Sequence, residues 1–393
     1  MTRTRATNPA TAGQVLRLVR EGTATTRTEI GQVTGLSRTA VASRLAALLD
    51  AGLVVETDDP GSGVGRPPSR ISFHTGAGVV LAAALGRSRT HVAVCDLAGA
   101  VLAGAEFEQE IGLGPDELLP RVVRRLRTAL QRAGRSPESV RGVGLSIPGT
   151  VDGERRCSYE SPIMRGWNGI PLTPYFASLG PAPVFLENDT NVIALAERFG
   201  HLPGHADALI VKASTGFGAG IVTGGVLQHG ALGAAGEIGH VKYAPARNLP
   251  CRCGEVGCLE AIAGGWALVR NMREAGYDVA HVRDVARLGL DGDAVARKQI
   301  RDSGRHFGSV LAAAVTLLNP GAIVVGGDLA PAYDMFVAGL RETLYRDASA
   351  VATRDLRIVA ATHGEQSGVY GCAVLALDHV LAEEAIDAAL AAP

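Results

Sequence analysis

From residue 76 onward the sequence alternates short apolar strands with helices in two successive blocks, and this order restricts the fold more than any other feature. The first block has expected helices at 122–132 and 192–199, and expected strands at 79–85, 91–96, 140–147 and 184–187. The second block has expected strands at 208–213, 219–222 and 322–327. Strands that alternate with helices are typical of an α/β architecture. We therefore expect two lobes facing one cleft.

The expected domain boundaries follow from these blocks. Residues 76–187 would form the first α/β lobe and residues 188–372 the second. A last helix over 373–390 would pack back on the first lobe, so that 373–393 completes it. Residues 1–75 precede this region as a separate domain, and 393 residues are enough for two or three domains of about 150 residues each.

Charge separates the first domain from the rest. The whole chain has 38 basic and 39 acidic residues, but residues 1–75 hold nine arginines against six acidic side chains. A polyanionic partner would therefore bind this domain. No apolar run approaches the roughly 18 residues of a membrane-spanning helix, so we expect a cytoplasmic protein without a membrane partner.

The first domain has the pattern of a helix-turn-helix. Apolar residues recur at helical spacing between Gln14 and Val54. Thr26 and Glu29 have the spacing of a capping box, and Ser37 is placed to cap a third helix. Strands at 53–56 and 70–73 flank a loop rich in glycine and proline, which predicts a hairpin wing. The alternative is a small helical packing module with a solvated arginine face.

The third helix supplies the candidate DNA contacts. Val41, Leu45 and Leu48 share its buried face, so other side chains face outward. Arginine can bind guanine with two hydrogen bonds, and serine or threonine can reach bases or phosphates. The candidate contacts, including one in the wing loop, are Ser37, Arg38, Thr39, Ser43, Arg44 and Arg66.

Three cysteines within eight residues give the sharpest local signal. Cys251, Cys253 and Cys258 follow His240, and together they complete the Cys₃His shell of a structural Zn²⁺ site without an open position. The alternative is free thiols in a reducing compartment beside a coincidental histidine.

Further polar residues surround this metal candidate. Glu237 and Glu260 lie just outside the cysteine cluster, so a folded metal loop would bring both carboxylates together. Carboxylates accept hydrogen bonds from sugar-like hydroxyls. Upstream, the run Glu187-Asn188-Asp189-Thr190-Asn191 ends a strand and opens a helix, where an asparagine can equally serve as a helix cap.

Taken in order, these motifs resemble the ROK family of sugar kinases and sugar-responsive repressors. The helix-turn-helix with its GRPP wing is similar to the repressor branch, and the segments GLSIPG (144–149), ENDTN (187–191), GEIGH (236–240) and CRCGEVGCLE (251–260) are similar to family motifs. The resemblance implies an actin-like fold of two lobes, related to sugar kinases and ribonuclease H. It also implies a sugar site built from Asn188, Asp189, Glu237, His240 and Glu260.

The sequence departs from the kinase branch at the phosphate loops. The family's acidic phosphate-loop residue is replaced by Ala84, a glycine by Arg87, and a glycine of the second loop by Ser214. Ala84 cannot help to hold magnesium, and Arg87 places bulk where the backbone would approach phosphate. We therefore expect no enzyme activity, whereas in a kinase Asp189 would be the general base.

These observations predict a DNA-binding regulator, most simply a repressor, that responds to a sugar or sugar phosphate. Its partner would be a double-stranded DNA operator, its cofactor a structural Zn²⁺, and its assembly a homodimer or homotetramer. Two alternatives stay open: an active ATP-dependent sugar kinase that also binds DNA, and a regulator controlled by a protein partner.

Overall fold

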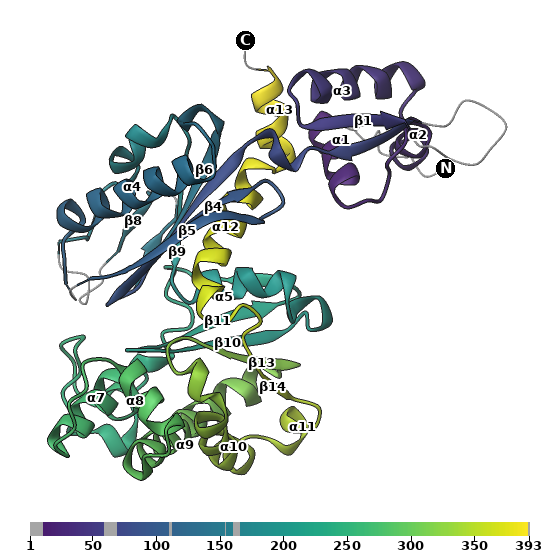
Figure 1. Ribbon diagram of the computed structural model, residues 1–393. Coiled ribbons are helices and arrows are strands. Elements are labelled where there is room, and N and C mark those ends of the chain that lie inside the picture. Colours follow the sequence, from purple (N-terminus) through teal and green to yellow (C-terminus); the bar gives the residue numbers. More distant parts are fainter. Residues whose placement is uncertain (1–10, 59–68, 110–111, 154, 160–165, 392–393) are drawn as a thin grey trace.

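The computed structural model describes residues 11–58, 69–109, 112–153, 155–159 and 166–391, arranged as a small N-terminal domain and two α/β lobes (Figure 1). No helix in this part of the chain is long and apolar enough to cross a bilayer.

The N-terminal domain consists of α1 (Ala12–Arg20), α2 (Arg27–Thr34), α3 (Arg38–Asp50) and a two-stranded antiparallel sheet of β1 (Val54–Asp58) and β2 (Ser69–Phe73). The Thr26–Glu29 capping box is confirmed, and the Ser37 Oγ accepts the backbone N–H of Ala40 at 3.2 Å. Gly35 ends α2 in the left-handed conformation that glycine adopts without strain. This order of helices and paired strands agrees with the predicted helix-turn-helix and wing, and residues 59–68 between the two strands lie outside the described residues.

The first lobe is built on a five-stranded sheet of order β5-β4-β3-β6-β9. Its strands are β3 (Val79–Leu85), β4 (Arg89–Asp96), β5 (Val101–Glu108), β6 (Val140–Ile147) and β9 (Val184–Asn188). The first three form an antiparallel meander, and β6 and β9 run parallel to β3. Helix α4 (Pro115–Arg132) covers one face, and α12 (Ser367–Val380) covers the other.

The second lobe repeats this strand order, as β12-β11-β10-β13-β14. Its strands are β10 (Ala208–Ala213), β11 (Phe217–Thr223), β12 (Val226–Gln228), β13 (Ala322–Gly326) and β14 (Arg357–Ala360). One face carries α7 (Gly265–Glu274), α8 (Val282–Leu290), α9 (Ala294–Leu318) and α10 (Tyr333–Asp347). Helix α5 (Asn191–Ala196) packs on the opposite face. The expected pair of α/β lobes is thus confirmed.

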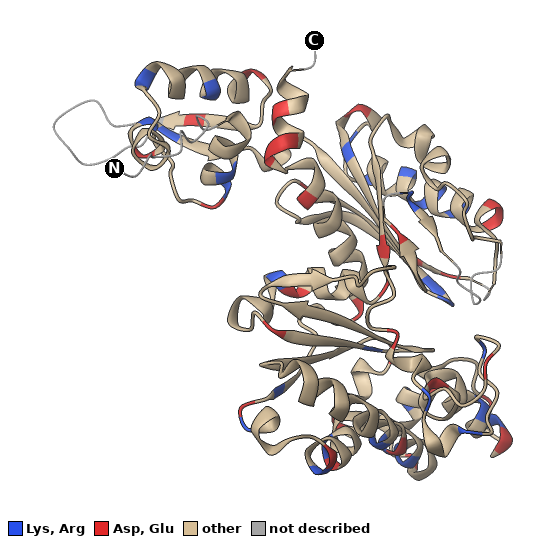
Figure 2. Cartoon of the chain, turned by 180° about the vertical axis from the view of Figure 1, so that it is seen from behind, with Lys and Arg blue, Asp and Glu red and all other residues tan. Residues whose placement is uncertain are grey.

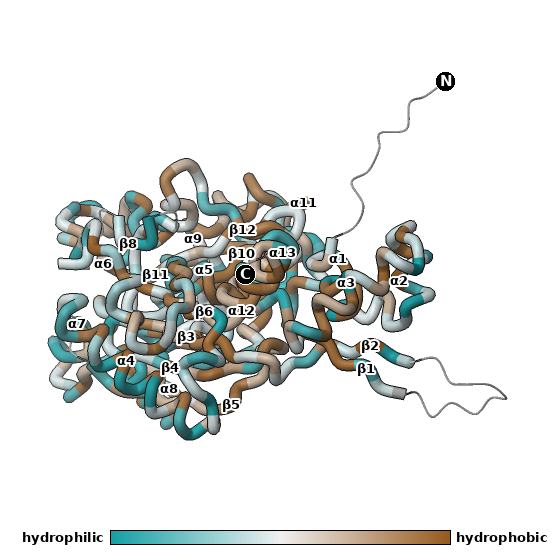
Figure 3. Tube along the Cα trace, turned by 90° about the horizontal axis from the view of Figure 1, so that it is seen from above, coloured by the Kyte–Doolittle hydropathy of each residue, from teal (hydrophilic) through white to brown (hydrophobic). Residues whose placement is uncertain are grey.

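The C-terminal region differs from the expectation of one helix over 373–390. Helix α12 already begins at Ser367 and packs on the first sheet, but the helical path breaks after Val380 and α13 (Glu383–Ala391) packs against α1. Leu381 and Ile386 are thereby buried in a core shared with the N-terminal domain. Figure 3, viewed from above, shows hydrophobic residues gathered around α12, with α13 beside α1.

Candidate functional site

A cleft opens between the two lobes, and loops from both of them line it. The first lobe contributes the β3–β4 turn and Pro148-Gly149, and the second contributes the 214–218 turn and Gly327-Asp328. Ser367 and Gly368, at the start of α12, also face this space. The cleft is therefore bordered by the ends of both sheets and by the helix that runs between them.

Asn188 and Asp189 lie in the cleft where β9 ends. The Asn188 Oδ1 accepts the backbone N–H groups of Thr190 (2.7 Å) and Asn191 (3.1 Å), and its Nδ2 donates to the Gly149 carbonyl at 2.9 Å. The Asn188 side chain thus satisfies backbone N–H groups at the start of α5, although Thr190 is the N-cap residue of that helix, and one amide hydrogen of Asn188 is left for a ligand. Asp189 forms an ion pair with Lys212 of β10.

Sequence reasoning missed Lys212. It is one of only three lysines in the chain and stands in an otherwise apolar strand, and both features are visible in the sequence. That it would pair with Asp189, in the turn after β9, cannot be read from the sequence. The ion pair joins β10 of the second lobe to the turn that follows β9, and both side chains are partly buried, with exposed fractions of 19% for Lys212 and 15% for Asp189. The charge of Asp189 is consequently balanced within the protein.

Glu237 and Glu260 both line the cleft, close enough for their charges to interact. Glu260 is only 4% exposed, and its carboxylate accepts hydrogen bonds from the Trp266 indole (2.9 Å) and the Phe217 backbone N–H (3.1 Å). Glu237 is less constrained. Burial raises the pKa of its carboxyl group, His240 opposes this effect, and the nearby Asp189 and Glu260 add to it.

The Cys₃His cluster is assembled, because the ligand atoms of His240, Cys251, Cys253 and Cys258 all lie within 4.8 Å of one another. The Cys253 and Cys258 sulfurs are 3.8 Å apart, and the His240 Nδ1 lies 3.8 Å from the Cys251 sulfur. A tetrahedron with Zn–S bonds of about 2.3 Å has edges of about 3.8 Å. The residues therefore fit a tetrahedral ion of this size.

His240 joins this cluster to the cleft. Its Nδ1 faces the cysteine sulfurs, and its Nε2 lies 3.8 Å from the Glu237 carboxylate. A metal-bound imidazole normally directs its second nitrogen to a hydrogen-bond partner. The ring can thus bind a metal on one side and a cleft ligand on the other.

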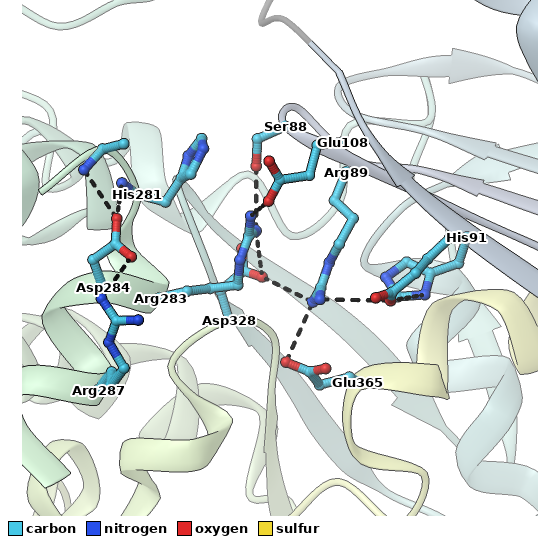
Figure 4. A network of polar contacts seen from close by, with 12 residues as sticks. Ser88, Arg89, His91, Glu108, His281, Arg283, Asp284, Arg287, Asp328 and Glu365 are labelled. Atoms are coloured by element: carbon cyan, nitrogen blue, oxygen red, sulfur yellow. Dashed lines mark hydrogen bonds and ion pairs between the residues drawn. The ribbon is translucent and has the colours of Figure 1, made fainter.

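A network of charges crosses the cleft beside the β3–β4 turn (Figure 4). Arg89 of β4 and Arg283 of α8 both contact the Asp328 carboxylate, at 3.8 and 3.5 Å. Arg283 also reaches Glu108 (3.4 Å) of the first lobe, and Arg89 reaches Glu365 (3.3 Å). We call these five residues the inter-lobe latch. Sequence reasoning did not find it, since each contact joins residues far apart in the chain.

The three residues that differ from the kinase branch of the family also line the cleft. Ala84, Arg87 and Ser214 all border it. The Ser214 Oγ accepts the backbone N–H of Asp328 at 2.9 Å, so it fixes the turn that carries the latch carboxylate. Arg87 stands in the β3–β4 turn, where its Nε is buried and has no hydrogen-bond partner among the described residues.

The candidate DNA contacts lie on and beside α3, and Figure 2 shows basic residues along this helix. Arg38, Thr39 and Ser43 are exposed, as is Ser37, whose hydroxyl is used as the helix cap. Arg44 is partly buried and donates a hydrogen bond to the Ala40 carbonyl at 3.4 Å. Arg66 lies outside the described residues.

The sequence is similar to those of known proteins over most of its length. The ROK family profile matches residues 80–379. The DNA-binding transcriptional repressor Mlc of Escherichia coli K12 is 26% identical over 376 residues, which cover 93% of this chain and 92% of Mlc. The glucokinase of Thermotoga maritima is 32% identical over 259 residues, which cover 61% of this chain and 80% of the kinase.

A solved structure has the same fold over nearly the whole chain. A crystal structure described as a ROK family transcriptional regulator, a homologue of the E. coli MLC protein, superposes with a TM-score of 0.79 at 25% identity. The superposition covers 96% of this chain and 98% of that one. Since the family profile spans most of the sequence and the fold agrees throughout, the chain belongs to the ROK family.

Proposed function

We propose that this chain is a DNA-binding transcriptional regulator, a repressor, whose inter-lobe cleft senses a sugar or sugar derivative. The similarity to Mlc extends over 93% of the chain, whereas the similarity to the glucokinase covers 61%. The observation that carries the proposal is the continuous path from the cleft to the helix-turn-helix along α12 and α13.

This path begins at Ser367 and Gly368, which line the cleft. Helix α12 then runs between the sheets, where Gly371 lies so close to the Val192 carbonyl that any side chain at this position would collide with it. Beyond Val380, α13 is joined to α1 by an ion pair between Glu383 and Arg17 (2.6 Å). A shift of α12 would therefore displace the N-terminal domain.

Sugar binding and DNA binding would be coupled because the sugar has different affinities for the open and the closed cleft. A sugar that binds best to the closed cleft raises the closed population, and the displacement of α12 lowers the DNA-competent population. Helix-turn-helix proteins usually bind two half-sites as dimers, so a homodimer or homotetramer on a double-stranded, pseudo-palindromic operator fits this design. Such a regulator acts in the cytoplasm.

The proposed sugar site consists of Asn188, Asp189, Glu237, His240 and Glu260. We assign the Cys₃His cluster to a structural Zn²⁺, held by His240, Cys251, Cys253 and Cys258. A bound Zn²⁺ would supply a tetrahedral cross-link that fixes the loop. The proposed domains are 1–75, 76–187 and 188–372, with α12 completing the first lobe and α13 joining the N-terminal domain.

We propose no kinase activity, because Ala84, Arg87 and Ser214 replace phosphate-loop residues and Lys212 pairs with the candidate base Asp189. The second candidate function, a sugar kinase that also binds DNA, is favoured by Asp189 and by the glycine-rich turn at 214–220. ATP-dependent phosphorylation of a sugar that is lost in Asp189→Asn would establish it.

The test of the regulator proposal is fluorescence anisotropy of a labelled DNA fragment from the region upstream of the gene, at fixed salt. We expect specific binding that one sugar or sugar derivative releases. Arg38→Ala and Arg44→Ala should each weaken DNA binding and leave sugar affinity unchanged. The exposed residue Arg354, far from α3 in the sequence, supplies the control Arg354→Ala. Tight binding that every sugar leaves unchanged would contradict sugar sensing.

A further inference from the structure

The charged side chains that line the cleft are paired with one exception. Arg89 and Arg283 share Asp328, Lys212 pairs with Asp189, and Glu365 contacts Arg89. Glu260 accepts two hydrogen bonds, and the histidines and Glu237 have partners as well. Among the described charged residues that line the cleft, Arg87 alone has neither a hydrogen bond nor an ion pair.

The environment of Arg87 makes this lack of a partner costly. The side chain is partly buried, and its Nε–H is shielded from solvent and donates to no acceptor among the described residues. A buried donor without a partner loses its hydration and gains nothing in return. Arg87 lies in the tight β3–β4 turn, where the Gly86 N–H donates to the Arg89 carbonyl at 2.8 Å, so its backbone is fixed. The turn thus fixes the point at which the Arg87 side chain leaves the backbone beside the cleft.

The other charges that line the cleft with Arg87 leave room for a bound anion. Lys212 neutralises Asp189, and Ala84, three residues before Arg87, carries no charge; all of them line the cleft. Helix α12 also starts here without a side-chain cap, and the positive end of its dipole adds to the potential. An acidic group bound beside Arg87 would therefore meet an unpaired guanidinium, while the charge of Asp189 is balanced by Lys212.

We propose that the effector is an anionic sugar derivative whose phosphate or carboxylate group pairs with Arg87. This inference rests on the proposed sugar-sensing function and narrows its ligand class. The guanidinium presents a planar fork of donors that matches two oxygens of a phosphate or carboxylate, and such charge-assisted pairs are stronger than neutral hydrogen bonds. The sugar hydroxyls would remain with the carboxylates around His240.

The experiment is isothermal titration of the full-length protein with matched probes. Each neutral sugar is compared with its charged forms: glucose with glucose 6-phosphate and glucuronate, and N-acetylglucosamine with its 6-phosphate. Inorganic phosphate alone reports on binding of the charge without the sugar. The proteins are wild type, Arg87→Ala, and Arg354→Ala as the control for loss of an exposed arginine.

We expect at least one charged derivative to bind about tenfold or more tightly than its neutral parent. Arg87→Ala should abolish this preference and leave the affinity for the neutral parent within about twofold, and Arg354→Ala should change neither. Preference for a phosphate or for a carboxylate identifies the group. Equal binding of neutral and charged forms, or a preference that persists in Arg87→Ala, overturns the inference and leaves sugar sensing intact. Binding of no probe at all would count against both proposals, and DNA release by a sugar would then decide the proposed function separately.

Discussion

The Nε2 atom of His229 lies 2.6 Å from the Oε2 atom of Glu187, and this contact joins the loop after β12 of the second lobe to the end of β9 in the first. The other Glu187 oxygen accepts hydrogen bonds from the Asn188 backbone N–H (2.7 Å) and the Asn191 amide (2.9 Å). The strand end that carries Asn188 and Asp189 is therefore held by a titratable side chain from the opposite lobe.

This contact predicts a pH dependence of stability. The hydrogen bond to Glu187 raises the pKa of His229, and burial opposes it. A raised pKa in the folded state gives stability that is fully present below the unfolded value of about 6.5 and is lost as pH rises through the folded value. We expect the difference in Tm between wild type and His229→Asn to be larger at pH 6 than at pH 9. A constant difference across this range would exclude an ionic contact.

The inter-lobe latch should contribute to the closure of the cleft. Asp328→Asn removes the charge shared by Arg89 and Arg283, and we expect it to destabilise the protein by about 1–3 kcal/mol. Small-angle scattering should also show a larger radius of gyration. Asp334→Asn, at an exposed position in α10, is the control. An unchanged Tm and radius would show that the latch does not hold the lobes.

The junction of α1 and α13 leaves no room for a side chain at position 13. A Cβ on Gly13 would lie 2.6 Å from the Glu383 Cα. Gly13→Ala should therefore weaken DNA binding and lower the Tm, with an overpacking cost of about 1–3 kcal/mol. Gly31→Ala is the matched control in α2, where the nearest atom would be 3.5 Å away. Normal operator affinity in Gly13→Ala would show that the packing of α13 against α1 does not affect DNA binding.

The Cys₃His cluster predicts a metal-dependent loop. Cys253→Ser should lower the zinc content measured by mass spectrometry and weaken sugar binding, because Glu237 and Glu260 flank the loop. Cys95→Ser is the control, since Cys95 is buried in β4 outside the cluster. A full complement of zinc in Cys253→Ser would refute the ligand assignment.

Local sequence patterns predicted the local structure well. The Thr26–Glu29 box and the Ser37 cap act over three residues, and the Cys₃His cluster is confined to 19 residues between His240 and Cys258. The β5 strand and the latch were not predicted, and the Gly13–Asp387 hydrogen bond spans 374 residues of sequence. Such contacts depend on how the lobes and helices pack together, and a single sequence carries no periodic signal for them.

The position of α13 also has a consequence for the order of synthesis. The helix-turn-helix emerges from the ribosome before the two lobes, yet Leu381 and Ile386 of its shared core are added more than 300 residues later. Until α13 has been synthesised, the apolar residues of α1 that pack against it remain uncovered. A nascent or prematurely terminated chain would thus carry a DNA-binding domain without its complete core, and the operator would be bound firmly only by chains whose sensor lobes have already been made.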